Sequence, residues 1–158
     1  MSLSQRAFRD ALGTYTTGVC IITVQPPGRR PIGMTVNSFA SVSLDPPLVL
    51  WSLQNGSECF AAFEGATQFG VNILSNSQQD LSNYYAQKGD HSLIKGSYRQ
   101  GKSGCIVLKD VITSFECNMH ARHDGGDHTI LVGHVQEMHA KPAGKPLVFY
   151  SGSYRELK

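Results

Sequence analysis

The chain is built from short runs of β-branched and apolar residues, and each run ends in a cluster of turn-forming residues. Residues 19–24 read Val-Cys-Ile-Ile-Thr-Val and lead into the proline- and glycine-containing stretch 25–30. A second extended run covers residues 32–44 and closes at residues 45–47, and a third, residues 48–53, is apolar enough to be buried on both faces. β-branched residues favour strands, while Gly, Pro and Asp favour turns. This order therefore predicts strands joined by short connections.

The same pattern continues through the rest of the chain. Further strands are predicted at residues 69–74, 105–108, 111–119, 128–138 and 147–150. About eight short strands in one domain favour a closed or half-closed antiparallel barrel, because closure removes exposed sheet edges. We therefore predict a mainly β fold with a few short helices, in a single domain over residues 1–158.

Three short helices are predicted beside the strands. The first begins after Ser4 and ends at Gly13, and its apolar side chains recur three and four residues apart. They are Phe8, Ala11, Leu12 and Tyr15. The second helix starts at Ser57, and the third starts at the capping-box match of residues 77–80. The polar, glycine-rich residues 88–104 are predicted to form a loop or lid.

Composition excludes several classes of protein. Charged residues are 16% of the chain, with 16 Gly and 7 Pro, which excludes a coiled coil or a long-helix protein. The net charge of +2 is too small for a protein that binds nucleic acid by neutralising phosphates. Apolar residues make up 41%, enough to exclude disorder.

Three sequence features indicate the cellular compartment: the cysteines, the first residues of the chain and the length of the apolar runs. Cys20, Cys59, Cys105 and Cys117 are scattered, a pattern typical of free buried thiols rather than of a disulfide framework. The first six residues contain no apolar stretch, so no signal peptide is predicted. Every apolar run is far shorter than the roughly 20 residues that a bilayer span needs. We therefore expect a cytoplasmic protein with no membrane partner.

The stretch from Gly33 to Pro47 is the best candidate for a binding site. It is extended in pattern, yet it carries small hydroxyl and amide side chains where a core strand would carry Val, Ile and Leu. Small side chains let a flat ligand approach the backbone, whose N–H and C=O groups then bind it. The alternative is the solvated face of an alternating strand. Asn37 and Ser38 are adjacent polar residues, which breaks that alternation and favours the ligand site.

Several segments, in this order along the chain, match one known family. They are Phe8-Arg9-Asp10-Ala11-Leu12-Gly13 with Thr16-Thr17-Gly18-Val19, residues 33–47, Phe69-Gly70-Val71-Asn72-Ile73-Leu74, Gly126-Asp127-His128 with Thr129 and Gly133, and residues 146–154. Together they span nearly the whole chain. In this order they resemble the short-chain flavin reductase family.

The resemblance implies a fold and an activity. The fold would be a split β-barrel that binds FMN, of the Greek-key type. The activity would be NAD(P)H:flavin oxidoreductase, with FMN or FAD reduced by hydride transfer from NADH or NADPH. The protein would be a homodimer, and it would supply reduced flavin to a separate monooxygenase component.

The resemblance also implies which residues bind the flavin. Those implied to line it are Met34, Thr35, Val36, Asn37 and Ser38, with Ser41, Val42 and Ser43 at the isoalloxazine edge. Those implied to lie near the ribityl phosphate are Ser52, Leu53, Gln54, Asn55 and Ser57. Independently of the family, a Ser at a helix start offers free N–H groups to an anion, although a plain N-cap is the alternative. Family members often carry Lys or Arg in this segment, and this chain does not.

A second candidate site follows Gly125. Two glycines allow a tight turn at a strand end, and Asp127 and His128 follow directly. The resemblance implies that His128 lies near the nicotinamide, and it is our candidate for the catalytic residue that orients NAD(P)H, with Asp127 beside it. Of the six histidines, only His128 stands in a motif.

Other chemistries find less support. Cys117, His120 and His123 have metal-like spacing, but positions three apart on a strand point to opposite faces, so we predict no metal site. The chain has no G-x-S-x-G elbow and no G-x-G-x-x-G fingerprint. Two alternatives to the reductase keep the barrel. One is a flavin carrier or sensor without nicotinamide turnover, and the other is a relative of pyridoxamine-phosphate oxidase or of haem-binding proteins.

Overall fold

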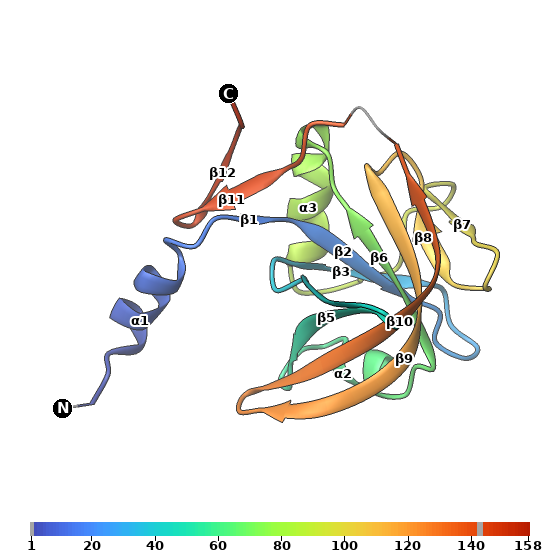
Figure 1. Ribbon diagram of the computed structural model, residues 1–158, viewed down its shortest axis with the longest axis horizontal. Coiled ribbons are helices and arrows are strands. Elements are labelled where there is room, and N and C mark those ends of the chain that lie inside the picture. Colours follow the sequence, from blue (N-terminus) through green and yellow to red (C-terminus); the bar gives the residue numbers. More distant parts are fainter. Residues whose placement is uncertain (1, 142–143) are drawn as a thin grey trace.

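The computed structural model describes residues 2–141 and 144–158, and its largest element is one seven-stranded antiparallel sheet. The strand order is β3-β2-β6-β9-β10-β5-β4 (Figure 1). The strands are β2 (Cys20–Val24), β3 (Ile32–Val36), β4 (Ala40–Leu44), β5 (Pro47–Gln54), β6 (Gln68–Ile73), β9 (Thr113–Gly125) and β10 (His128–Ala140). The edge strands β3 and β4 are not paired with each other, so the curved sheet stays open between them. The predicted mainly β, split architecture is confirmed.

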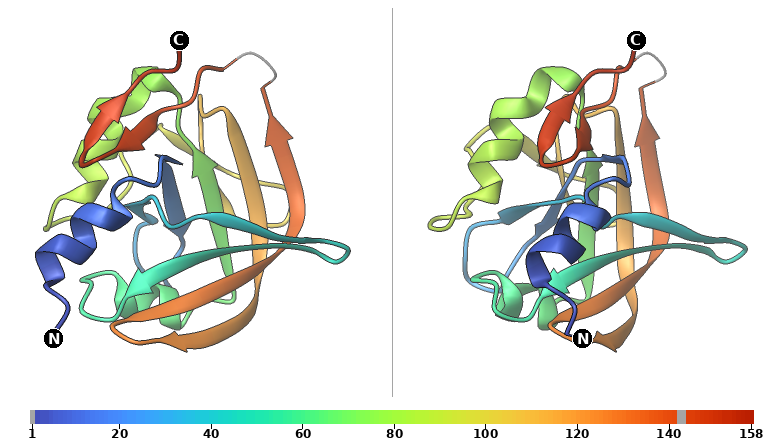
Figure 2. Two further views of the ribbon diagram at one scale, coloured as in Figure 1. Left: turned by 60° about the vertical axis from the view of Figure 1, so that its left-hand side comes forward. Right: turned by 90° about the vertical axis from the view of Figure 1, so that its left-hand side faces the viewer.

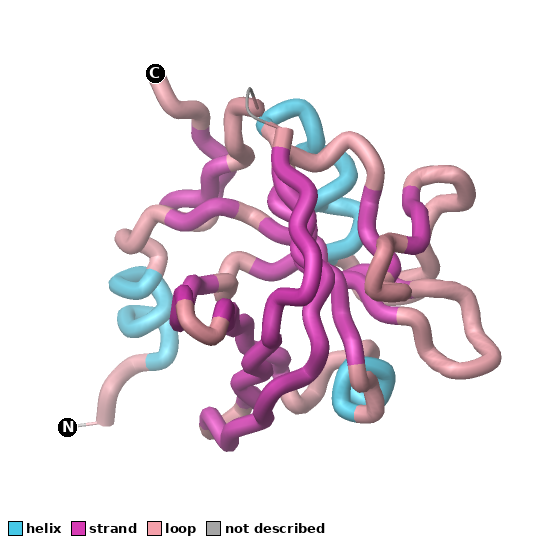
Figure 3. Tube along the Cα trace, turned by 45° about the vertical axis from the view of Figure 1, so that its right-hand side comes forward, coloured by secondary structure: helices cyan, strands magenta, loops and turns pink. Residues whose placement is uncertain are grey.

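Smaller elements surround this sheet. One small sheet joins β1 (Thr17–Gly18), β11 (Val148–Tyr150) and β12 (Ser153–Arg155), and another joins β7 (Tyr98–Gln100) and β8 (Ile106–Leu108). The helices are α1 (Gln5–Leu12), α2 (Phe60–Glu64), α3 (Gln79–Ala86) and the 3₁₀ helix η1 (Asn76–Gln78). Figure 3 shows α2 and α3 at opposite ends of the strand body. The described residues contain 12 strands, more than the sequence predicted, because strands of two or three residues show no periodicity.

The extended run 32–44 is two strands rather than one, which corrects the sequence prediction. β3 and β4 lie at opposite edges of the sheet and are joined by residues 37–39 alone. A connection this short spans at most about 14 Å, so the two edges approach each other at this end. The Ser38 hydroxyl accepts from the Ser52 N–H at 3.0 Å and donates to the Ser52 carbonyl at 3.3 Å. Ser38 thus fastens the connection to β5.

β5 is buried on one face only, contrary to the prediction for residues 48–53. Val49, Trp51 and Leu53 are buried, while the residues between them, Ser52 among them, are partly exposed. The side chains of a strand alternate between its faces, so Ser52 lies on the face opposite Leu53. Ser52 is therefore available on the face that does not form the core.

Two apolar clusters form the core. In one, Trp51 packs edge to face against Phe63 and Phe69, with ring centroids 4.9 and 6.0 Å apart. The other lies where α3 and the following segment pack against the sheet, and it includes Tyr85 and Leu93. Both of these side chains are fully buried. Residues 88–104 are a loop, as predicted, apart from the short strand β7. Leu93 anchors this loop in the core.

Two helix starts differ from the predicted positions. The capping box before α3 joins Ser75 and Gln78, two residues before the predicted match at 77–80. α2 begins at Phe60, three residues after Ser57. In both cases side chains of the preceding turn bond to backbone N–H groups, and the regular helical hydrogen bonds begin only after this turn.

Helix α1 is formed as predicted, with the Ser4 hydroxyl accepting from the Ala7 N–H and with its C-cap at Gly13. None of its residues is buried, and it projects away from the strand body (Figures 1 and 2). Its apolar face, which includes Phe8 and Leu12, is half exposed or more. The part of the chain described here has no helix with the length and hydropathy needed to cross a bilayer.

Candidate functional site

A cavity of about 380 Å³ opens at the split edge of the sheet, between β3 and β5. Its size falls within the range of small-molecule sites, about 300–1,000 Å³. It is lined by the end of β3, by β5 and its following turn, by the end of α3, and by the start of β10. The predicted site residues that line it are Met34, Thr35, Val36, Asn37, Ser38, Ser52, Gln54, Ser57 and His128. The fold thus brings the two predicted flavin segments and the predicted nicotinamide histidine to one place.

The other predicted site residues lie outside this lining. Ser41, Val42 and Ser43 are on the edge strand β4, and Leu53 is fully buried on the core face of β5. Asn55 directly follows β5, and Asp127 lies in the loop between β9 and β10, to which Asn55 is bonded. Their predicted contacts with the flavin stay predictions.

Asn55 fastens the end of β5 to the β9–β10 hairpin. Its backbone N–H donates to the Asp127 carbonyl at 2.9 Å, and its side-chain amide donates to the Gly126 carbonyl at 3.2 Å. The Thr129 hydroxyl donates to the Asn55 Oδ1 at 2.8 Å. These three bonds fix the hairpin tip relative to β5, and with it the backbone of His128.

The hairpin tip is the tight turn that the sequence predicted. Gly125 pairs with His128, which leaves Gly126 and Asp127 as the two-residue loop, with Gly126 at φ +77°. Two-residue hairpins favour a glycine with positive φ at the first loop position. The Asp127 carboxylate lies 2.7 Å from the His128 Nδ1, and the side chains are 86% and 41% exposed, respectively. His128 is thus held at one ring nitrogen and remains accessible.

Several hydroxyl groups in the predicted flavin segment have structural partners. The Thr35 hydroxyl donates to the Ser82 carbonyl of α3 at 2.7 Å, and Ser38 is bonded to Ser52. A Cβ on Gly33 would lie 2.8 Å from the Leu93 side chain, so this glycine is required by packing. The side chains left for a ligand at the end of β3 are chiefly Asn37, together with backbone groups.

Ser57 closes a turn rather than a helix start. Its hydroxyl accepts from the Cys59 N–H at 3.1 Å, and its carbonyl accepts from the Phe60 N–H at 3.1 Å. The Ser57 N–H itself donates to the Gln54 carbonyl at 3.0 Å. These three N–H groups are therefore engaged, which corrects the expectation that a free helix N-terminus here would bind an anion.

One wall of the cavity consists of residues that were not predicted as site residues. Its lining residues are Glu58, Tyr85, Ala86, Gln87, Lys88 and His91. Lys88 is the only Lys or Arg among the described lining residues, so it supplies the cation that the segment 52–57 lacks. A sequence signal for this wall exists, because Gly89-Asp90-His91 repeats the triplet Gly126-Asp127-His128. His128 is therefore not the only histidine in the motif.

Glu58 and His91 connect the parts of this wall. The His91 Nε2 lies 3.2 Å from the Glu58 Oε2, which also accepts from the Gly89 N–H at 2.9 Å. The Gly89 N–H, and after it the His91 ring, lower the pKa of the Glu58 carboxyl despite its partial desolvation. Glu58 is therefore ionised at neutral pH.

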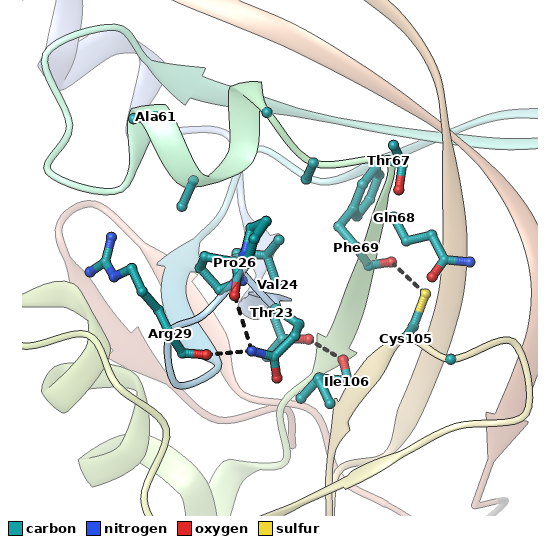
Figure 4. Close-up of a pocket in the computed structure, with 16 residues that line it drawn as sticks. Thr23, Val24, Pro26, Arg29, Ala61, Thr67, Gln68, Phe69, Cys105 and Ile106 are labelled. Carbon is teal, nitrogen blue, oxygen red and sulfur yellow. Dashed lines mark hydrogen bonds between the residues drawn. The ribbon is translucent and has the colours of Figure 1, made fainter.

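A second cavity, of about 490 Å³, contains none of the predicted site residues (Figure 4). Its polar groups are largely paired with one another. The Gln25 amide donates to the Pro26 and Arg29 carbonyls, and the Thr23 hydroxyl donates to the Ile106 carbonyl. These bonds hold the loop after β2 and leave few groups for a ligand.

The four cysteines are free and buried, as predicted. Burial raises the pKa of the Cys20 and Cys117 thiols to about 12 and that of Cys59 to about 11. Thiolates are the reactive form of cysteine. These three side chains are therefore not suited to nucleophilic chemistry.

The arrangement suits a flat ligand with an anionic group. The split edge presents backbone groups and small neutral side chains, Lys88 provides a cation, and His128 stands at the rim. An isoalloxazine ring with a phosphate tail matches this set of donors. Fold and site together define an open-edged β protein with a binding pocket for a cofactor of this kind.

Comparison with known proteins identifies the family. The flavin reductase like domain matches residues 12–158, and the chain belongs to that family. It is 45% identical to the NADH-dependent FMN reductase SmoA of Agrobacterium fabrum, over 96% of this chain and 85% of that protein. It is 41% identical to the NADH-dependent FMN reductase AsuE2 of Streptomyces nodosus subsp. asukaensis, over 96% and 84%.

A solved structure agrees with this assignment. The NADH:FAD oxidoreductase SgcE6 of Streptomyces globisporus, in complex with NAD and FAD fragments, superimposes with a TM-score of 0.91. It is 30% identical, and the match covers 100% of this chain and 98% of that one. The predicted fold and family are thus confirmed by both sequence and structure.

Proposed function

We propose that the chain is an NAD(P)H:flavin oxidoreductase that reduces FMN or FAD. The observation that carries the proposal is the cavity at the split edge, which joins the segment Met34–Ser38 to β5 and to His128. Relatives that share 41–45% of its residues are named NADH-dependent FMN reductases. No observation favours the carrier or sensor alternative.

Each part of the cavity has a role in this proposal. The end of β3 and β5 hold the isoalloxazine ring through backbone groups, Asn37 and Gln54. Lys88 holds the phosphate, and His128 orients the nicotinamide. A bound flavin supplies the acceptor for a hydride from reduced nicotinamide, so the residues of the chain have only to bind and align the two rings.

We extend the proposal to assembly and partners. The chain forms one domain, and a homodimer covers the apolar face of α1, where Phe8 is 50% and Leu12 59% exposed. Reduced flavin passes to a separate monooxygenase component in the cytoplasm. A relative 34% identical over 99% of this chain is named the reductase subunit HsaB of a flavin-dependent monooxygenase, which supports this partner.

The direct test measures nicotinamide oxidation by its loss of absorbance. Purified protein is mixed with NADH or NADPH, each with FMN, with FAD or with no flavin. The proposal expects oxidation that requires flavin, and faster turnover with NADH. Absence of flavin-dependent oxidation with either nucleotide would overturn it.

A further inference from the structure

His91 has two hydrogen-bond partners, and both are acceptors. Its Nδ1 lies 3.1 Å from the Gly33 carbonyl oxygen, and its Nε2 lies 3.2 Å from the Glu58 Oε2. The side chain is only 11% exposed. A carbonyl oxygen and an ionised carboxylate carry no proton to donate. The ring nitrogens are thus the only possible donors to these two oxygens.

The His91 ring joins three parts of the cavity wall. Gly33 belongs to β3, Glu58 belongs to the turn after β5, and His91 follows α3. The backbone adds a further bond, from the Gly33 N–H to the His91 carbonyl at 2.9 Å. Lys88 is the residue next to Gly89, whose N–H is bonded to Glu58. These bonds therefore fix the backbone beside Lys88.

We propose that His91 is a positioning residue that, by its bonds to Gly33 and Glu58, holds Lys88 in place to bind the flavin phosphate. The inference rests on the proposed function, since it names how that site gains its cation. Removal of the His91 ring breaks these bonds and loosens the wall. Affinity for FMN then falls, while affinity for a flavin without a phosphate does not.

The test measures the Kd of FMN by calorimetry, without nucleotide, at neutral pH. His91→Gln keeps a donor near the Nε2 position, His91→Asn keeps one near Nδ1, and His91→Ala keeps neither. His139→Gln, at the exposed end of β10, is the matched control. Riboflavin, which lacks the phosphate, is the second ligand.

We expect His91→Ala to raise the Kd of FMN about three- to fivefold, and His91→Gln and His91→Asn to raise it about two- to threefold, because each of these two keeps one donor. His139→Gln should bind FMN like the wild type. Riboflavin affinity should change less than about twofold in every variant. Equal losses of FMN and riboflavin affinity, or unchanged FMN affinity in His91→Ala, would overturn the proposal.

A second comparison separates this proposal from the proposed function. In a chain that already carries Lys88→Gln, adding His91→Ala should not weaken FMN binding further, because the cation that the ring positions is gone. A further loss of FMN affinity in the double variant would overturn the inference. Failure to bind FMN at all would overturn the proposed function as well as the phosphate role.

Discussion

The triplet Gly-Asp-His occurs at residues 89–91 and again at residues 126–128, and each copy places its histidine on a wall of the same cavity. His91 is bonded at both ring nitrogens, and its side chain is 11% exposed. His128 is bonded at Nδ1 to its neighbour Asp127, and its side chain is 41% exposed. The two histidines therefore differ in how much of the ring is free to meet a ligand.

The difference comes from what each triplet packs against. Residues 89–91 follow α3 and lie on β3, where the first aspartate bonds to the Ser92 backbone and leaves its histidine to reach Glu58. Residues 126–128 form the turn of an exposed hairpin, where the aspartate bonds to the histidine itself. One sequence motif thus yields an anchored histidine that holds a wall and an accessible histidine that can bind a substrate.

The largest expected effect concerns the accessible histidine. His128→Ala should raise the KM for NADH about tenfold, because the ring that orients the nicotinamide is removed, a loss of roughly 1.4 kcal/mol. The Kd of FMN should change less than about twofold. Steady-state kinetics and calorimetry check this, with His139→Ala as the control. Weakened FMN binding with an unchanged KM would show that the role is wrongly assigned.

The next effect concerns the cation that the anchored histidine holds. Lys88→Gln should raise the Kd of FMN about fivefold and leave riboflavin binding nearly unchanged, because only FMN carries a phosphate. Lys88→Arg should keep most of the affinity, and added salt should narrow the difference between wild type and Lys88→Gln. An equal loss of riboflavin affinity would mean that Lys88 does not meet the phosphate.

A smaller effect is expected on stability at acid pH. The pKa of Glu58 is lowered in the folded chain, first by the Gly89 N–H and then by His91, so its contribution is present above its ordinary pKa of 4.5. That contribution is lost as the pH falls through the lowered value. Glu58→Gln should therefore reduce Tm at pH 7 by about 3 °C or less. The difference from wild type should vanish in strongly acidic buffer, and a difference that grows in acid would contradict the account.

The smallest effect is expected at the exposed pair. Asp127→Asn keeps an acceptor for the His128 ring, and exposed ion pairs contribute little to binding or stability. The KM for NADH should therefore change about twofold, with no change in the Kd of FMN. An effect as large as that of His128→Ala would mean that the charge of Asp127 acts directly on the substrate.

Much of the fold could be predicted because strand signals are local. The β-branched runs at residues 19–24 and 69–74 are strands, and Ser4 and Gly13 bound the first helix. The split of residues 32–44 could not be predicted from local pattern, since both halves are extended. The strands are separated by the connection 37–39. Ser38 fastens this connection to Ser52, and only the tertiary fold brings these two residues together.

The candidate site was predicted on two of its walls. Residues 34–38 and His128 carry family motifs, and the fold brings them to one cavity. The wall formed by Tyr85, Lys88 and His91 was missed because these residues meet β3 only when α3 packs on the sheet. The repeated triplet was the available signal, but a motif alone does not distinguish an anchored histidine from an accessible one.

The central claim is that the two histidines of one cavity serve different ligands. The most direct measurement compares His91→Gln and His128→Gln side by side, with the Kd of FMN and the KM for NADH determined for each at pH 6. We expect His91→Gln to raise the Kd of FMN about two- to threefold, while His128→Gln raises mainly the KM for NADH. The same parameter changing in both variants, or the reverse assignment, would contradict it.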